Sequence, residues 1–181
     1  KIPTAAIPVE DTLRIQRLAN RGIKVRLRLK MEAHFEPDVE SFNVVGEIRG
    51  REKPEEIVLV GCHFDSWDPA GGASDDGVGC IVTWEAARLM KKLGITPRRT
   101  VRVVLFTNEE NGLRGGNGYR DLYAKEAANH IFSLESDSGV FAPSRLGFSG
   151  PPAARQIMAD LGTLLAPFSQ VMQAAAQLRE Q

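Results

Sequence analysis

Three short, continuous runs of apolar residues alternate along the chain with stretches of helical periodicity. The runs cover residues 57–60, 101–106 and 131–134, and the helical stretches cover about 77–93 and 117–128. A continuous apolar run of this length is typical of a strand that is buried on both faces of a sheet. Strands that alternate with helices form right-handed crossovers and run parallel to one another. The sequence therefore predicts an α/β fold, with three α/β/α layers around a central, mainly parallel (mixed) sheet.

The pattern changes near residue 41, before which the chain has a different character. Residues 24–31 alternate strictly between apolar side chains and Lys or Arg, which is typical of a half-buried edge strand. We expect two domains, a short one over 1–40 and the main one over 41–181. Further strands are predicted over 5–9 and 43–48, and further helices over 10–20, 150–165 and 171–180.

The charge balance disfavours two classes of partner. The 23 Lys and Arg residues match the 23 Asp and Glu residues, so the formal net charge at pH 7 is zero. A nucleic-acid-binding protein usually carries a basic excess, and electrostatic attachment to an anionic membrane requires one. No apolar run approaches the ~20 residues of a membrane-spanning helix. We therefore expect a globular protein with neither nucleic acid nor a membrane as partner.

The two cysteines, Cys62 and Cys80, are too few for a disulfide scaffold or a thiolate zinc site. We expect both to be buried free thiols. The first residues lack the apolar stretch of a signal peptide. The chain also begins without Met, so we expect a processed form or a piece of a longer protein.

Polar side chains that can bind metals or move protons follow each of the three apolar runs. His63 and Asp65 follow the first run, Glu109 and Glu110 the second, and Asp137 the third. Because the carboxyl ends of parallel strands share one edge of a sheet, these segments deliver an imidazole and several carboxylates to one place. Each acid alone is also compatible with a helix cap or a solvated loop. Their coincidence at three strand ends favours a functional site.

Several carboxylates beside one histidine favour a divalent metal. Like charges repel, so such a cluster needs protons or cations to neutralise it. With one imidazole and no cysteine among the candidate ligands, zinc is the metal favoured. Asp65 lies two residues after His63 on an extended segment, from where it can accept the ring N–H and fix the tautomer. The adjacent Glu109 and Glu110 suggest that one binds metal while the other stays free as a general base.

These candidates lie in four ordered motifs that resemble the co-catalytic dizinc exopeptidases. The matching segments are residues 61–68, 72–77, 99–110 and 135–139. Four motifs with intact order and spacing are far more specific than a single pair of glutamates, and the resemblance continues to about residue 167. It implies a zinc-exopeptidase-like fold. It also implies that residues 1–40 are the C-terminal part of a protease-associated-like inserted domain.

The resemblance assigns a role to each candidate residue. It implies four metal ligands, which are His63 and Asp137 on one zinc ion, Glu110 on the second zinc ion, and Asp75 bridging both. It implies two catalytic residues, which are Glu109 as the general base and Asp65 as the residue that orients the metal-binding histidine. It also implies a cis peptide bond between Asp75 and Asp76.

The activity implied by the resemblance is hydrolysis of a peptide bond by a water that two zinc ions activate. Members of such families cleave short peptides at a free terminus, so dipeptides and terminal residues are the expected substrates. The resemblance further implies a homodimer, and secretion or a lysosomal or periplasmic location.

The chain departs from the family pattern at one ligand. The pattern requires a further histidine well after the third strand, whereas the histidines here are His34, His63 and His130. Either the molecule has further residues that supply it, or the second zinc ion has only Asp75 and Glu110 as protein ligands. In the second case we expect a catalytically impaired peptidase-like domain. A single-zinc relative of the glutaminyl cyclases is a further alternative, which the pairing of a histidine with an aspartate two residues later disfavours.

Overall fold

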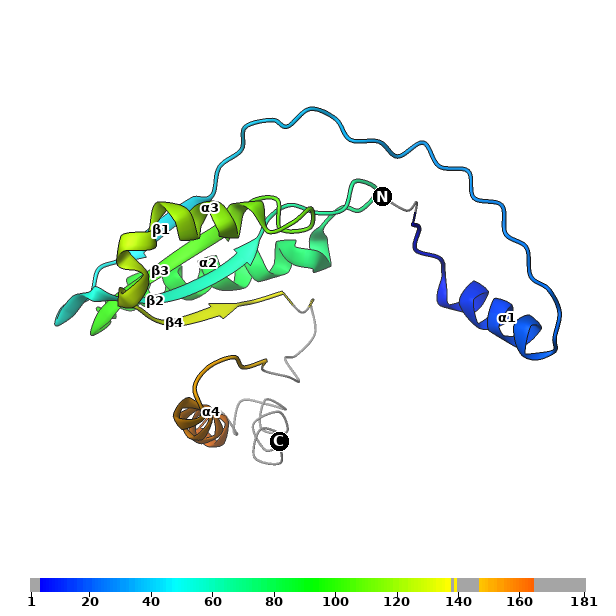
Figure 1. The fold of residues 1–181 in the computed structure, drawn as a ribbon. Coiled ribbons are helices and arrows are strands. Elements are labelled where there is room, and N and C mark those ends of the chain that lie inside the picture. Colours follow the sequence, from blue (N-terminus) through cyan, green and yellow to red (C-terminus); the bar gives the residue numbers. More distant parts are fainter. Residues whose placement is uncertain (1–3, 138, 140–146, 165–181) are drawn as a thin grey trace. The chain divides into compact units, whose positions relative to one another are not determined.

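The computed structural model describes residues 4–137, 139 and 147–164 (Figure 1). The chain divides into two compact units, residues 1–39 and 40–181. The assignment of the first unit to the end of an inserted domain stays a prediction.

The first unit contains, within the described residues, the helix α1 (Val9–Asn20) that the sequence predicts. The helix ends at Asn20, and Gly22 follows with a positive φ of 73° and donates its N–H to the carbonyl of Ala19. A left-handed residue just after the last turn is a common helix terminator, and glycine adopts it without a steric penalty.

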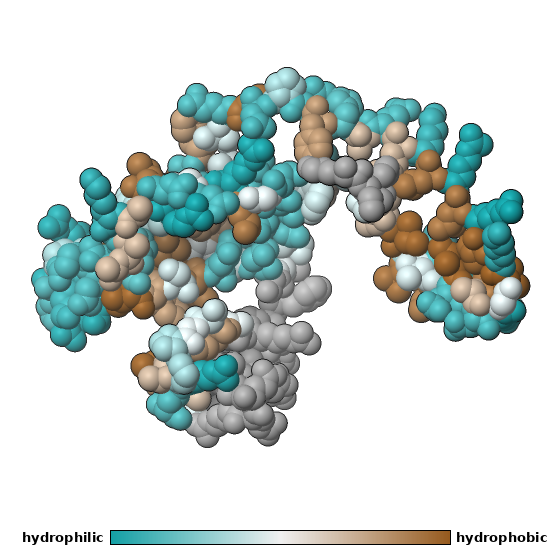
Figure 2. All heavy atoms as spheres, viewed as in Figure 1, coloured by the Kyte–Doolittle hydropathy of each residue, from teal (hydrophilic) through white to brown (hydrophobic). Residues whose placement is uncertain are grey.

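The two strands predicted in the first unit, over 5–9 and 24–31, are wrong. A strand needs a neighbour for its main-chain hydrogen bonds, and no described strand pairs with these segments. The apolar side chains of the alternating stretch, among them Leu27 and Leu29, are therefore exposed, and apolar side chains are visible on the surface of this unit (Figure 2). An alternating pattern indicates which face of an extended segment is apolar. It does not indicate whether another part of the protein covers that face.

The second unit is built on a mixed sheet of four strands in the order β1-β3-β2-β4. The strands are β1 (Val44–Ile48), β2 (Lys53–His63), β3 (Arg99–Phe106) and β4 (His130–Glu135). β2 pairs in parallel with both β3 and β4, and β1 pairs with β3 in the antiparallel sense. The predicted α/β fold with a mainly parallel, mixed sheet is confirmed.

Helices and turns connect these strands or follow the last of them. They are η1 (Ala73–Gly77), α2 (Val78–Lys92), α3 (Arg114–Leu122), η2 (Ala124–Asn129) and α4 (Pro152–Leu164). The helix predicted over 117–128 is divided, because α3 ends and a 3-10 turn, η2, follows after Tyr123. The helix predicted over 171–180 lies outside the described residues. Among the helices that are described, none combines the length and apolar content needed to cross a membrane.

The helices α2 and α3 cover opposite faces of the sheet (Figure 1). Phe106 of β3 contacts Tyr119 of α3, with the ring centroids 5.8 Å apart. Its neighbour Leu105 lines a groove together with Trp84 of α2. Successive side chains of a strand point to opposite faces, so these contacts define the three layers. The buried apolar cluster lies on the α3 side and consists of Ile57, Leu59, Val104 and Tyr119.

Arg102 of β3 is buried and connects four elements of the second unit. Its Nε donates to Glu47 of β1 at 2.6 Å, its Nη1 to the hydroxyl of Tyr119 of α3 at 2.7 Å, and its Nη2 to Glu126 of η2 at 3.4 Å. The guanidinium also lies 4.5 Å from the ring centroid of Tyr123. A buried cation with this many partners fixes the edge strand and α3 relative to the centre of the sheet.

Replacing Arg102 by Met should lower the free energy of unfolding by about 2 kcal/mol, because the Tyr119 hydroxyl and two carboxylates lose their common partner. Urea denaturation measures this loss. Arg120→Met is the matched control, since Arg120 pairs with Asp121 where both side chains are 68% exposed. The control should change stability by less than about 0.5 kcal/mol. Equal losses in the two variants would contradict the role of Arg102.

Gly115, at the start of α3, lies against the end of β3. Its N–H donates to the carbonyl of Thr107 at 2.8 Å, and its own carbonyl accepts from the Asn43 side chain at 2.8 Å. A Cβ at this position would collide with the main chain of Thr107 and the side chain of Asn43. The close approach of Gly115 to Thr107 brings together the two ends of the segment that carries Glu109 and Glu110.

Gly115→Ala should therefore destabilise the protein by about 2 kcal/mol, because the added methyl group forces the two segments apart. Gly118→Ala in the same helix is the matched control. A Cβ there meets nothing within 4 Å in the described part of the chain, so this variant should gain about 0.5 to 1 kcal/mol of helix propensity. Thermal unfolding of both variants gives the comparison, and shifts of the same sign would refute it.

Candidate metal centre

The carboxyl ends of β2 and β4 bring three of the predicted ligands together. His63 ends β2, Asp137 follows β4, and Asp75 lies in η1. The Nε2 atom of His63 lies 3.1 Å from Oδ1 of Asp75 and 3.3 Å from Oδ1 of Asp137. One ligand atom from each residue lies within 4.8 Å of the other two. A nitrogen and two carboxylate oxygens at this spacing can bind one divalent cation.

The ring of His63 is oriented by the main chain of Asp65. His63 is almost wholly buried, at 1% exposed. Its Nδ1 lies 3.0 Å from the carbonyl oxygen of Asp65, which accepts a hydrogen bond when Nδ1 carries the proton. Nε2 then keeps its lone pair for a cation. The sequence leads us to expect the Asp65 carboxylate as this partner, but that carboxylate lies 3.6 Å from Nδ1, beyond hydrogen-bond distance.

The Asp65 carboxylate instead holds the segment that carries the two glutamates. Its Oδ1 accepts the N–H of Glu109 at 2.9 Å, and its Oδ2 accepts the N–H of Glu110 at 3.2 Å. Asp65 therefore fixes the loop after β3 relative to the loop after β2. Sequence analysis missed this role, because no local pattern links residues 44 positions apart.

Glu110 carries an unsatisfied acceptor. Among the described residues, its buried Oε1 atom has no hydrogen-bond partner. Burial and the negative charge of Asp75 raise the pKa of the Glu110 carboxyl. A carboxylate oxygen removed from water without a donor is unfavourable, and a cation is a partner that would satisfy it. The donor set thus fits a divalent metal, although Glu110 lies outside the group of His63, Asp75 and Asp137.

Asp76 supports the centre through the main chain. It is 1% exposed, and burial raises the pKa of its carboxyl. Its Oδ1 accepts the N–H of Gly79 at 3.0 Å, and its Oδ2 accepts the N–H of His63 at 3.3 Å. Asp76 is therefore both a cap for the start of α2 and a support for the end of β2. The peptide bond between Asp75 and Asp76 is cis, as the resemblance implies.

Negative charge around His63 favours a cation at this place. Burial by itself lowers the pKa of His63, but the Asp65 carbonyl and the charges of Asp137 and Asp76 outweigh it, so the pKa is raised. A raised pKa in a buried imidazole indicates that the electrostatic potential around the ring is negative. A proton on Nε2 and a metal ion compete for the same position.

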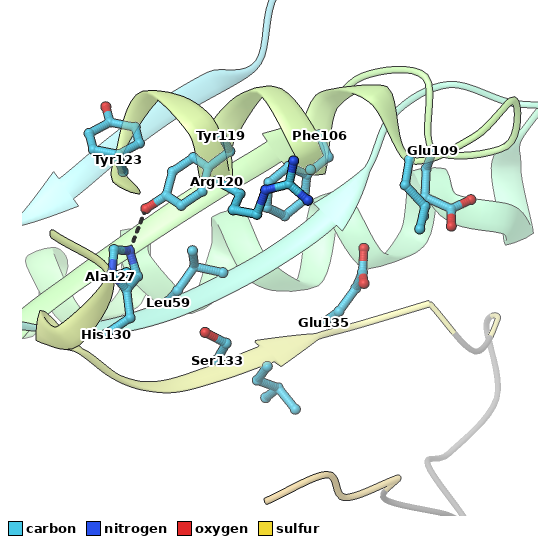
Figure 3. Close-up of a pocket in the computed structure, with 13 residues that line it drawn as sticks. Leu59, Phe106, Glu109, Tyr119, Arg120, Tyr123, Ala127, His130, Ser133 and Glu135 are labelled. Carbon is cyan, nitrogen blue, oxygen red and sulfur yellow. Dashed lines mark hydrogen bonds between the residues drawn. The ribbon is translucent and has the colours of Figure 1, made fainter. Parts of the chain in front are cut away.

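A cavity of about 530 Å³ opens beside Glu109 (Figure 3). Glu109 and Glu135 lie toward one end of it, and Tyr119 and His130, joined by a hydrogen bond of 2.8 Å, lie toward the other. Burial raises the pKa of Glu135, and the charges of Asp137 and Glu109 raise it further. Glu109 therefore faces a space large enough for a small ligand.

Replacing His63 by Ala should weaken zinc binding by about 100-fold or more, because it removes the nitrogen ligand of the described group. Competition with a chromophoric chelator measures the affinity. His34→Ala is the matched control, since His34 is an exposed histidine in the first unit, bonded to Glu36. The control should bind zinc as the parent protein does, and equal affinity of all three proteins would rule out a centre at His63.

Comparison with known proteins gives the relatives of the chain. Residues 43–180 match the sequence model for Peptidase family M28. The chain is 47% identical over 169 residues to carboxypeptidase Q of Xenopus laevis, and equally so to carboxypeptidase Q of Homo sapiens. Each match covers 93% of this chain and 36% of the relative, so the chain spans about a third of the length of these curated relatives.

A solved structure agrees with the fold. The peptidase M28 precursor from Shewanella amazonensis SB2B is 37% identical with a TM-score of 0.65, over 69% of this chain and 28% of that one. The sequence match and the shared fold together place the chain in a class of α/β proteins related to metallopeptidases. The chain belongs to peptidase family M28. The resemblance of its four motifs to zinc exopeptidases, carboxypeptidase Q among them, is confirmed.

Proposed function

We propose that this chain forms the metal-binding core of a zinc-dependent exopeptidase that hydrolyses dipeptides or the terminal residues of short peptides. The observation that carries the proposal is the convergence of His63, Asp75 and Asp137 at one edge of the sheet, within 4.8 Å of one another. An imidazole and carboxylates are the donor set of a catalytic zinc site. Glu110 adds a further carboxylate with a buried, unpartnered oxygen.

The proposal includes two zinc ions. His63 and Asp137 would hold one ion, Glu110 would hold the second, and Asp75 would be a ligand shared by both. The position of Asp75 supports the bridging role, because its carboxylate lies 3.1 Å from His63 while its charge also acts on Glu110. Bound zinc supplies a water of lowered pKa and polarises the scissile carbonyl.

Glu109 is the proposed general base, which takes a proton from the attacking water and returns it to the leaving amine. Glu109 is among the residues that line the cavity and lies outside the group of His63, Asp75 and Asp137, which suits a base that is not a metal ligand. Its main-chain N–H is held by Asp65. Asp65 is thus a positioning residue, since it acts through the His63 ring and through the Glu109 segment.

Short peptides are the proposed substrates because the cavity of about 530 Å³ beside Glu109 has room for a few residues. We further propose a homodimer that is secreted or located in a lysosomal or periplasmic compartment, on the strength of the resemblance to zinc exopeptidases. Residues 1–40 are, in the same proposal, the end of an inserted domain.

Glu109→Gln in the full-length protein should lower kcat/KM for a dipeptide by about 10²–10⁴-fold, because the amide keeps the shape of the side chain and loses its basicity. Zinc content, measured by mass spectrometry of the metal, should stay unchanged. Release of free amino acid from an unmodified dipeptide follows the reaction.

Glu85→Gln is the matched control, since Glu85 pairs with Arg88 on the surface of α2. It should retain the activity of the parent protein. Full activity in Glu109→Gln would eliminate that residue as the base. Hydrolysis that survives a chelator would contradict the metallopeptidase, and a zinc-loaded parent protein without activity would favour the catalytically impaired alternative.

A further inference from the structure

Cys62 and Cys80 face each other where the end of β2 meets the first turn of α2. Cys62 immediately precedes His63, and both cysteines are free thiols. Their sulfur atoms lie 2.7 Å apart. This separation is only about 0.7 Å more than the bond length of a disulfide. The fold therefore holds the two thiols at positions from which a small movement of the side chains would allow a disulfide bond to form.

The two thiols differ in their access to solvent. Cys62 is 0% exposed, and burial raises the pKa of both thiols. Cys80 is half-buried, and its Sγ donates to the carbonyl of His63 at 3.2 Å. An oxidant that approaches from solvent meets Cys80 first and has Cys62 directly behind it.

We propose that Cys62 and Cys80 form a disulfide bond under oxidising conditions. With a small disulfide such as oxidised glutathione as the oxidant, Cys80 gives up its proton and attacks one sulfur, forming a mixed disulfide and releasing one glutathione thiol. Cys62 then gives up its proton and displaces the second glutathione. The protein loses two electrons and two protons, and the oxidant leaves as two molecules of reduced glutathione.

The bond closes a covalent ring around the metal-binding loop. The cysteines are 18 positions apart, and the chain between them carries His63, Asp75 and Asp76. A cross-link restricts this loop in the unfolded chain and so favours the folded arrangement. Asp76 already connects the same two elements through main-chain hydrogen bonds, and the disulfide adds a covalent connection beside them. The inference does not depend on the proposed peptidase activity.

Peptide mapping of the full-length protein tests the proposal. The protein is treated with oxidised glutathione, denatured, alkylated with N-ethylmaleimide and digested with a protease that cuts before aspartate. This enzyme separates the two cysteines, because the chain between them contains Asp65, Asp68, Asp75 and Asp76. We expect two peptides joined by a bond that a reductant breaks, with neither cysteine alkylated. Alkylation of both cysteines, or a glutathione adduct on Cys80 that never closes, would overturn the proposal.

Thermal unfolding gives a second readout. The oxidised protein should melt roughly 5 °C above the reduced protein. Cys80→Ser and Cys62→Ser are the matched controls, and the melting temperature of each should be insensitive to oxidant and reductant. A shift of the same size in these variants would assign it to another cause. If either variant fails to fold, the peptide map of the parent protein still decides the question.

Discussion

The main chain and the ring of His63 are held by three different neighbours, and the geometry of the centre depends on these contacts. The N–H of His63 donates to Asp76, its carbonyl accepts from Cys80, and its ring lies 3.0 Å from the Asp65 carbonyl. A side chain that is 1% exposed and bonded in this way has little freedom to rotate. The two carboxylates near its Nε2 therefore lie beside an imidazole whose position the protein itself fixes, which is the preorganisation that the proposed metal centre requires.

Strand register explains why three distant segments reach the same place. His63 pairs with Phe106, the last residue of β3, and Gly61 pairs with Glu135, the last residue of β4. The chain consequently leaves the sheet after all three parallel strands at nearly the same level. Loops that start together at one edge can exchange hydrogen bonds, as Asp65 does with the segment after β3. Parallel pairing thus brings the three segments close together, and the loops after the strands carry the candidate site residues.

Local sequence patterns predict those features of this protein that depend on residues close together in the chain. The apolar runs predict the strands of the second unit, and the polar residues after them predict the candidate ligands. The same reasoning fails over 24–31, because alternation does not tell whether another strand will pair with it. It also cannot find the hydrogen bonds from Asp65 to Glu109 and Glu110, which join residues 44 and 45 positions apart. Such contacts follow from the register of the folded sheet and leave no periodic trace in the sequence.

The acids at this edge fall into two kinds, according to whether main-chain N–H groups donate to both of their carboxylate oxygens. Asp65 and Asp76 each accept two main-chain N–H groups, so both oxygens of each carboxylate have a donor within the protein. Asp75 instead has an exposed carboxylate that lies beside His63. The buried Oε1 atom of Glu110 has no donor among the described residues. A cation is the partner that we propose for the second kind, whereas each acid of the first kind already has two main-chain donors. Asp65 holds the loop that carries Glu110, and Asp76 is bonded beside Asp75, so the two kinds have different roles although the side chains are chemically alike.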